Sequence, residues 1–277
     1  MNALLTLAVA VVTMMMSTPR REMVPDVPPA SVVEALSQAA ATTWMSPGFL
    51  ASAAQCVLGR YGSLIDQYRG VIPASVVAVR IAVETGSRSD PAVCANPNAY
   101  VESTTEAGLL QVWVSRGSCG ITTKAQAFDP TTNLSCGLSL WNTSTQALIR
   151  SYAPSGRLQR SEGYEFWAVA QLNTMIGDGA TKKLLDLAGV RAGAEYTDLM
   201  NWVRAQGEGL ATYQSSFCGA SGCMTPGTVA WRVYLAGAMT QAAVAVGGLG
   251  GGFDDLGIYG VALVGAVGYY IAKHYSS

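Results

Sequence analysis

An apolar segment that ends in a single carboxylate most constrains how this chain folds. The segment runs from Pro73 to Glu84 and is followed by Thr85 and Gly86. Proline favours the first turn of a helix and glycine the position just past its end, so we expect a helix with Glu84 in its last turn. Apolar neighbours and the negative end of the helix dipole both favour the neutral form of a carboxyl group there. A general acid needs that neutral form near neutral pH. A solvated Glu at a helix end is the simpler alternative.

Two further segments follow Glu84 along the chain. The first reads Gly108-Leu-Leu-Gln-Val112, and the second reads Phe128-Asp-Pro-Thr-Thr-Asn-Leu-Ser-Cys-Gly137. Taken in order, the three segments resemble the lytic transglycosylases and goose-type lysozymes, which cleave peptidoglycan. In that family the catalytic Glu at a helix end is followed by a Ser, then by a Gly-Leu-Met-Gln-Ile type segment, and then by Asp-Pro with an Asn and a later Gly.

A fourth segment of the family, Ala-x-x-Tyr-Asn, is matched in part by residues 169–173. Leu172 stands where the family has a Tyr that packs near the catalytic Glu, whereas Asn173 matches. The resemblance covers about residues 70–180 and implies that Glu84 is the catalytic residue. The residues that it implies for substrate binding are Thr85, Gly108, Leu109, Gln111, Asn133 and Asn173.

The resemblance implies a reaction that needs one carboxylate. Glu84 would protonate the glycosidic oxygen between N-acetylmuramic acid and N-acetylglucosamine. It would then act as a base on the muramyl 6-hydroxyl, which gives a 1,6-anhydro sugar. The Thr85 hydroxyl could bond the catalytic carboxylate, and Gln111 and Asn133 would bond the sugar or hold the Glu84 loop. No cofactor and no metal ion is expected.

Three side chains near the second segment are further candidates. Glu106 is a second carboxylate, as in some lysozymes, or a solvated cap, and we favour the cap. Trp113 and Tyr100 could stack on sugar rings, although core packing is the favoured interpretation of Trp113.

Several other classes of function are excluded by composition. The chain has one His, His274, three residues from its end, whereas Ser-His-Asp triads, Cys-His pairs and two-His zinc motifs need His inside the folded body. The glycine-rich run Gly247–Gly252 lacks the Lys-Ser/Thr signature of a phosphate loop and is better interpreted as a linker. Net charge is -1 and the basic residues are scattered, so we expect no nucleic-acid binding.

The chain contains six cysteines and no Cys-x-x-Cys pair. Six cysteines allow fifteen full pairings, and the sequence alone does not choose between them. We expect at least one disulfide, and Cys218 with Cys223 is the most suggestive pair because a short glycine-containing turn separates them. The alternative is six buried free thiols. A disulfide would indicate an oxidising compartment.

The predicted fold is mainly α: a lysozyme-like, α-rich globular domain with hydrophobic N- and C-terminal segments. The only strand signal is a possible short hairpin around residues 112–114. We expect four parts. Residues 1–21 form a hydrophobic N-terminal segment (signal or anchor), 22–224 the lysozyme-like transglycosylase domain, 225–255 an apolar helix and glycine-rich linker, and 256–277 a C-terminal transmembrane helix. A buried hairpin helix is the alternative for the last part.

These features together predict a membrane-associated, periplasm-facing protein of a phage virion or bacterial envelope. It would open the cell wall locally for phage genome ejection or for an envelope-spanning machine. The expected partners are peptidoglycan glycan strands, the membrane through the terminal segments, and other virion or envelope-channel proteins. Two other hypotheses are a non-catalytic glycan-binding or structural module and a pore-forming, holin-like membrane protein. The last one accounts for the hydrophobic ends but not for the order of segments from Glu84 to Gly137.

Overall fold

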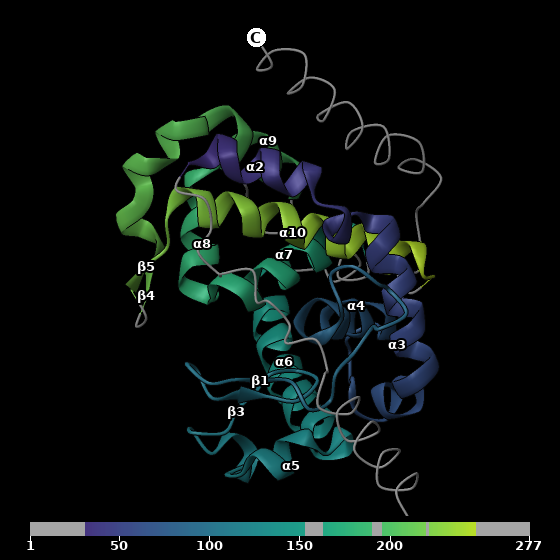
Figure 1. Ribbon diagram of the computed structural model, residues 1–277. Coiled ribbons are helices and arrows are strands. Elements are labelled where there is room, and N and C mark those ends of the chain that lie inside the picture. Colours follow the sequence, from purple (N-terminus) through teal and green to yellow (C-terminus); the bar gives the residue numbers. More distant parts are fainter. Residues whose placement is uncertain (1–30, 153–162, 190–195, 220–221, 248–277) are drawn as a thin grey trace, which may run out of the picture.

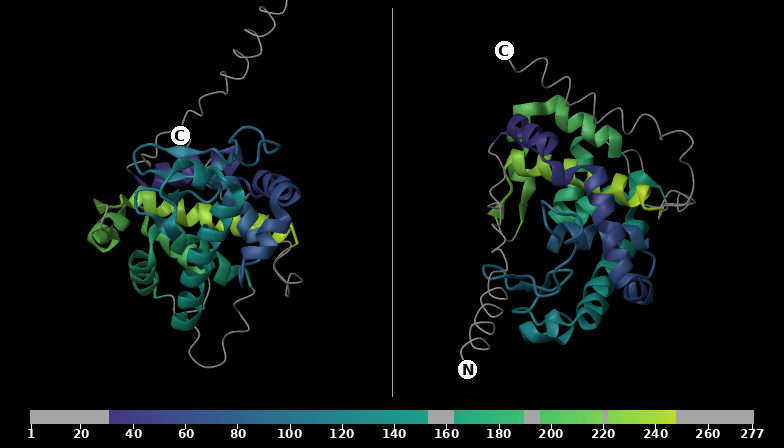
Figure 2. Two further views of the ribbon diagram at one scale, coloured as in Figure 1. Left: turned by 90° about the horizontal axis from the view of Figure 1, so that it is seen from below. Right: turned by 45° about the vertical axis from the view of Figure 1, so that its right-hand side comes forward.

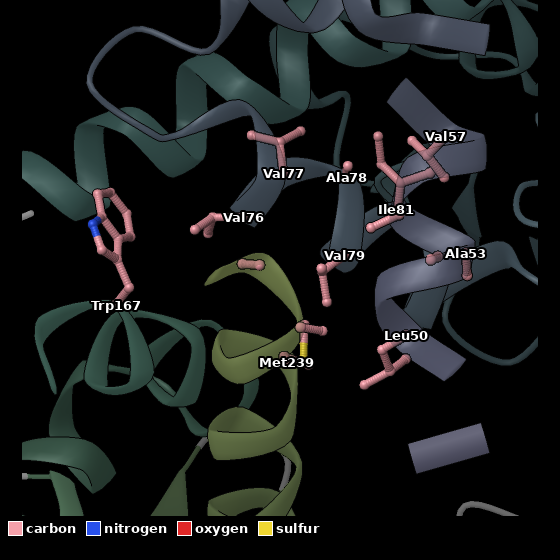
Figure 3. Packing of buried hydrophobic residues seen from close by; sticks show 14 of the residues in the cluster. Leu50, Ala53, Val57, Val76, Val77, Ala78, Val79, Ile81, Trp167 and Met239 are labelled. Atoms are coloured by element: carbon pink, nitrogen blue, oxygen red, sulfur yellow. The ribbon is translucent and has the colours of Figure 1, made fainter. Parts of the chain in front are cut away.

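The predicted helix that carries Glu84 lies at the centre of the fold. In the computed structural model, which describes residues 31–152, 163–189, 196–219 and 222–247, this helix is α4 and runs from Ala74 to Thr85, with Pro73 as its N-cap and Gly86 as its C-cap. Almost all of its side chains before the last turn are buried. Figure 3 shows them between Trp167 of α7, Met239 of α10 and three residues of α3.

The described residues are mainly α-helical. The other helices are α2 (Val32–Ala41), α3 (Pro47–Tyr68), α5 (Lys124–Phe128), α6 (Pro130–Tyr152), α7 (Tyr164–Ile176), α8 (Asp178–Leu187), α9 (Tyr196–Gln206) and α10 (Pro226–Ala245). Short 3₁₀ helices are η1 (Thr43–Met45), η2 (Ser118–Gly120) and η4 (Gly207–Phe217). In Figures 1 and 2, α2 and α9 lie at one end of the molecule and α5 at the other. The expectation of a mainly α-helical globular domain is therefore confirmed.

Helix α10 runs through the middle of the helical body (Figure 1). It is buried along most of its length and packs against α2, α3, α4 and α7. A small residue also allows α9 to approach closely, because a Cβ atom at Gly237 would lie 3.1 Å from the ring of Tyr196 in α9. The apolar helix that was expected within residues 225–255 is therefore present, and it packs into the helical body.

The sheet that accompanies the helices is small. Strands β1 (Tyr100–Val101), β2 (Glu106–Ala107) and β3 (Val112–Trp113) pair antiparallel in the order β1-β2-β3. Ala107 pairs with Val112, and both are buried against Ile121, Ala127 and Cys136. The expected hairpin around residues 112–114 is present, with β1 added as a third strand.

All six cysteines are paired. Cys56 of α3 is bonded to Cys94, and Cys119 of η2 is bonded to Cys136 of α6. The expected pair Cys218–Cys223 joins the two-residue strands β4 (Cys218–Gly219) and β5 (Gly222–Cys223). The alternative of six free thiols is therefore wrong.

The two hydrophobic ends, residues 1–21 and 256–277, lie outside the described residues. Among the helices that the structure does describe, none combines the length and the apolar character that a membrane span needs.

Candidate functional site around Glu84

Glu84 lies in the last turn of α4, as the sequence predicts. Its side chain is 26% exposed, which makes it accessible at the end of an otherwise buried helix. Its carboxylate is not in purely apolar surroundings, because Oε1 lies 2.5 Å from Nη2 of Arg80, one turn earlier in the same helix. That part of the sequence-based expectation was wrong.

Arg80 connects the carboxylate to a second helix. Its other terminal nitrogen, Nη1, donates a hydrogen bond to the Thr174 hydroxyl of α7 at 2.9 Å. Four residues earlier in α4, the Val76 carbonyl accepts a hydrogen bond from the Gln171 side chain of α7 at 3.3 Å. Helix α7 therefore lies alongside α4 and reaches the turn that holds Glu84.

Thr85 does not have the role that was expected for it. The side chain is buried, and its hydroxyl donates to the Ile81 carbonyl at 3.1 Å. The hydroxyl hydrogen therefore goes to the backbone of α4 and not to the carboxylate of Glu84. Such a bond to the carbonyl four residues back is a common local alternative for a helical Thr.

Asn133 holds the turn between β2 and β3 in place. Its Nδ2 donates to the carbonyls of Ala107 and Ala127, both at 2.9 Å, and its Oδ1 accepts from the Leu110 amide at 2.8 Å. The side chain is fully buried. The two roles expected for Asn133 were contact with the sugar and holding the Glu84 loop, whereas in the structure it holds the turn between β2 and β3. Direct contact with a sugar is not compatible with complete burial and three backbone partners.

The glycine and leucine of the same turn are also structural. Gly108 has a φ of +76°, and a Cβ atom there would overlap the Asn133 side chain and the Ala127 carbonyl. Only glycine fits such a position without rearrangement. Leu109 is fully buried in the same cluster as Val77 and Ile81 of α4. In this structure the packing of Leu109 joins the turn to the Glu84 helix.

Gln111 closes the turn from the other side. Its backbone has a φ of +50°, which is unusual for a residue other than glycine. Its Nε2 donates to the Gly108 carbonyl at 2.6 Å, and the residue is only half-buried. Gln111 is the one residue of this turn among the candidates that combines a polar end with exposure to solvent.

Asn173 and Leu172 lie in α7. Asn173 is buried, and its Nδ2 donates to Oδ1 of Asp178 at 2.5 Å, where α7 passes into α8. This bond gives Asn173 a role in the α7–α8 junction in place of the substrate contact that was expected. Leu172 is fully buried in the cluster formed with α8, α9 and α10. Leu172 is therefore a core residue of this chain.

Glu106 is neither a cap nor an isolated acid. It lies in β2 opposite Trp113 of β3, and one carboxylate oxygen accepts a hydrogen bond from the indole N–H of Trp113. The other oxygen accepts from the Thr104 hydroxyl at 2.7 Å. The favoured interpretation as a solvated cap was wrong, because the carboxylate connects two neighbouring strands.

Both candidate stacking rings contact cationic side chains. The Arg116 guanidinium lies 3.1 Å from the centroid of the Trp113 ring, and the Lys124 ammonium lies 3.5 Å from that of Tyr100. Trp113 is half-buried and lies outside the buried clusters, so the favoured interpretation as a core residue was wrong.

The candidate residues thus form two groups. Gly108, Leu109, Gln111 and Asn133 build one turn, whereas Glu84 and Thr85 lie in α4 and Asn173 in the neighbouring α7. Sequence reasoning missed Arg80 and Thr174. A signal for Arg80 was present, since it is the one charged residue within the apolar run before Glu84 and lies four residues from it.

Within the described part of the chain, no group of three or more His, Cys, Asp or Glu side chains could hold a metal ion. Comparison of the chain with protein-family models, with curated proteins and with solved structures found no match.

Proposed function

We propose that this protein is a peptidoglycan lytic transglycosylase that cleaves the bond between N-acetylmuramic acid and N-acetylglucosamine. The observation that carries the proposal is the position of Glu84. Its carboxylate lies in the last turn of the buried central helix, where it forms an ion pair with Arg80 and is 26% exposed. A residue that acts first as an acid and then as a base needs a fixed orientation and access to substrate, and the ion pair with Arg80 orients its ionised form.

The arrangement of the sequence segments supports the same proposal. The second and third segments meet through the hydrogen bonds of Asn133 to the Leu110 amide and the Ala107 carbonyl, and Leu109 packs that unit into the core beside α4. Gln111 lies in this turn and Trp113 lies in the strand after it, and both side chains are half-buried. They are the side chains that we propose for contact with the glycan.

The proposed reaction uses Glu84 twice. Its proton passes to the glycosidic oxygen as the bond from C1 to that oxygen breaks, and the N-acetylglucosamine hydroxyl leaves. The carboxylate then takes the proton of the muramyl 6-hydroxyl, whose oxygen closes on C1 to give the 1,6-anhydro product. No water is consumed, and Glu84 recovers its proton. Arg80 lies where it would stabilise the carboxylate that exists between the two steps.

For the location, we propose a phage virion or bacterial envelope protein that acts on the periplasmic side. Three disulfides favour an oxidising compartment. The proposed role is local opening of the cell wall for genome ejection or for an envelope-spanning machine. The partners would be glycan strands, the membrane through the two hydrophobic ends, and other virion or channel proteins.

Digestion of purified peptidoglycan, followed by mass spectrometry of the products, tests the proposal. Wild type and Glu84→Gln are compared with Glu102→Gln, which changes a carboxylate that is 85% exposed. Anhydro-muropeptides from wild type and Glu102→Gln, but not from Glu84→Gln, would support a transglycosylase. Reducing-end products would indicate a hydrolase and direct attention to Glu106. A folded wild type without any product would favour a non-catalytic glycan-binding or structural module.

A further inference from the structure

Arg80 interrupts a run of apolar residues in the central helix. Its side chain is only 16% exposed, and its neighbours in α4 are buried. Removing a guanidinium from water is costly unless its charge and its N–H groups have partners. The position therefore calls for an explanation in terms of the groups that Arg80 contacts.

The ion pair with Glu84 is a poor device for stabilising the helix itself. A pair with the basic residue first and the acidic residue four positions later is the less favourable order, because it places a carboxylate near the negative end of the helix dipole. Glu84 lies in the last turn of α4, where that effect is largest. The stability of the helix therefore does not explain the ion pair. Its explanation lies in what Arg80 does for the Glu84 carboxylate.

The guanidinium of Arg80 is held at both terminal nitrogens. Nη2 contacts Oε1 of Glu84 at 2.5 Å, and Nη1 donates to the Thr174 hydroxyl at 2.9 Å. Thr174 in turn donates its own hydrogen to the Gln171 carbonyl at 2.7 Å. The hydroxyl hydrogen is therefore used on the far side, which leaves an oxygen lone pair directed to Arg80. Because the guanidinium is planar and rigid, fixing one nitrogen fixes the direction of the other.

We propose that Arg80, oriented by Thr174, is a positioning residue for Glu84. It sets the direction of the carboxylate and stabilises its charge between the two proton transfers. This inference rests on the proposed transglycosylase function. It adds a contribution from Thr174 of α7, which lies outside the sequence segments that carry the resemblance.

The test measures kcat and KM for release of anhydro-products from soluble peptidoglycan fragments. Arg80→Met removes the guanidinium, and Thr174→Val removes only the hydroxyl. We expect kcat to fall about 100-fold for Arg80→Met, since a misdirected catalytic group costs roughly that factor, with little change in KM. Thr174→Val should lower kcat by about 10-fold, in the range found for groups that orient a catalytic residue indirectly. Thr174→Ser keeps the hydroxyl and should recover most of that loss.

Arg69→Gln is the matched control. Arg69 forms an ion pair with Asp66, three residues earlier, at the end of α3. Its side chain is 35% exposed against 16% for Arg80, it also donates to the Ile72 carbonyl at 3.0 Å, and its carboxylate partner is 64% exposed. Its kcat should equal that of wild type. Thermal unfolding of each variant identifies any that fail to fold, and Thr174→Val, a nearly isosteric change, then carries the test if Arg80→Met does not fold.

The outcomes separate the two proposals. If wild type releases anhydro-products but both folded variants keep the wild-type kcat, the positioning role is wrong and the transglycosylase proposal stands. A raised KM at unchanged kcat would also overturn it, because Arg80 would then bind substrate. If folded wild type releases no product, the proposed function fails, and the role of Arg80 fails with it.

Discussion

Asn133 offers the sharpest test of how the candidate site is built. Its side chain bonds three backbone groups of two different segments, the Leu110 amide and the carbonyls of Ala107 and Ala127. Replacing Asn133 with Ala removes all three bonds inside a fully buried region. Each buried polar group that loses its partner costs about 1–3 kcal/mol. Three such groups would cost about 3–9 kcal/mol, and water entering the vacated space would recover part of this. We therefore expect a loss of about 4 kcal/mol.

The same helix contains a matched control. Asn142 is also in α6, but it is half-buried, and the structure gives its side chain one hydrogen bond, from the Val71 amide at 3.2 Å. Water can replace that partner, so Asn142→Ala should cost less than about 1 kcal/mol. The two variants remove the same side chain from the same helix and differ mainly in burial and in the number of partners.

The assay is equilibrium unfolding in guanidinium chloride with the disulfides intact, followed by circular dichroism. The free energies of unfolding are compared only between variants whose free energy depends equally steeply on denaturant concentration. A changed slope would mean that the unfolded or native state had changed in compactness as well as in stability. If Asn133→Ala costs no more than Asn142→Ala, the turn is not held by this side chain. The argument that Asn133 is structural would then be refuted, and direct contact with substrate would again be its best explanation.

Three further predictions concern the surroundings of the site and the core. Gly86→Ala should destabilise the fold by about 1–3 kcal/mol in the same unfolding assay, because its Cβ would lie 2.5 Å from one carbonyl and 2.7 Å from another, and this overlap forces the backbone to move. Replacing Cys56 and Cys94 together with Ala should cost about 4 kcal/mol, as expected for opening a loop with a sequence separation of 38, and an unchanged melting temperature would contradict this. Burial raises the pKa of Tyr196 well above 10, and this folded-state pKa exceeds that of the unfolded chain. Its contribution to stability is therefore complete below pH ~10 and is lost as pH rises further, so unfolding midpoints should fall in alkaline solution, and less so for Tyr196→Phe.

The helix that carries Glu84 could be predicted from the sequence because local signals define both of its ends. Pro73 and Gly86 bracket it, and the structure places its ends at Ala74 and Thr85. The reason for the glycine is different from the usual one. Gly86 has a negative φ, and it is needed because two carbonyls approach it closely. The sequence therefore indicated the end of the helix correctly, whereas the close approach depends on how the loop after α4 brings the Cys94 carbonyl back to Gly86.

Helix α10 lies where the sequence predicted an apolar helix, but its central position could not be predicted. Its segment is rich in Ala, Gly and Val, a composition that suits a linker-bound apolar helix as well as a central one. The sequence shows that a segment is apolar on all sides, but not which helices surround it. Only the packing against α2 and α7 reveals that it belongs to the core.

The candidate site was predicted in part, because sequence segments do not distinguish residues that contact a ligand from residues that build the site. Gly108, Leu109 and Gln111 belong to one segment and Asn133 to the next, yet Gly108, Leu109 and Asn133 all support the turn. Arg80 was missed because its importance depends on Thr174, which lies 94 residues away in α7. Hydrogen bonds between helices have no local signature in the sequence.

The last turn of α4 is fixed from two sides, and the two connections differ in kind. On one side, Arg80 and Thr174 connect the carboxylate of Glu84 to α7 through hydrogen bonds. On the other side, the segment that leaves α4 packs with Gly86 against the carbonyl of Cys94, and the disulfide joins Cys94 to α3. The first connection directs the side chain, whereas the second holds the backbone that follows it. A precise acid at a helix end needs both, since the carboxylate can be no better placed than the turn that carries it.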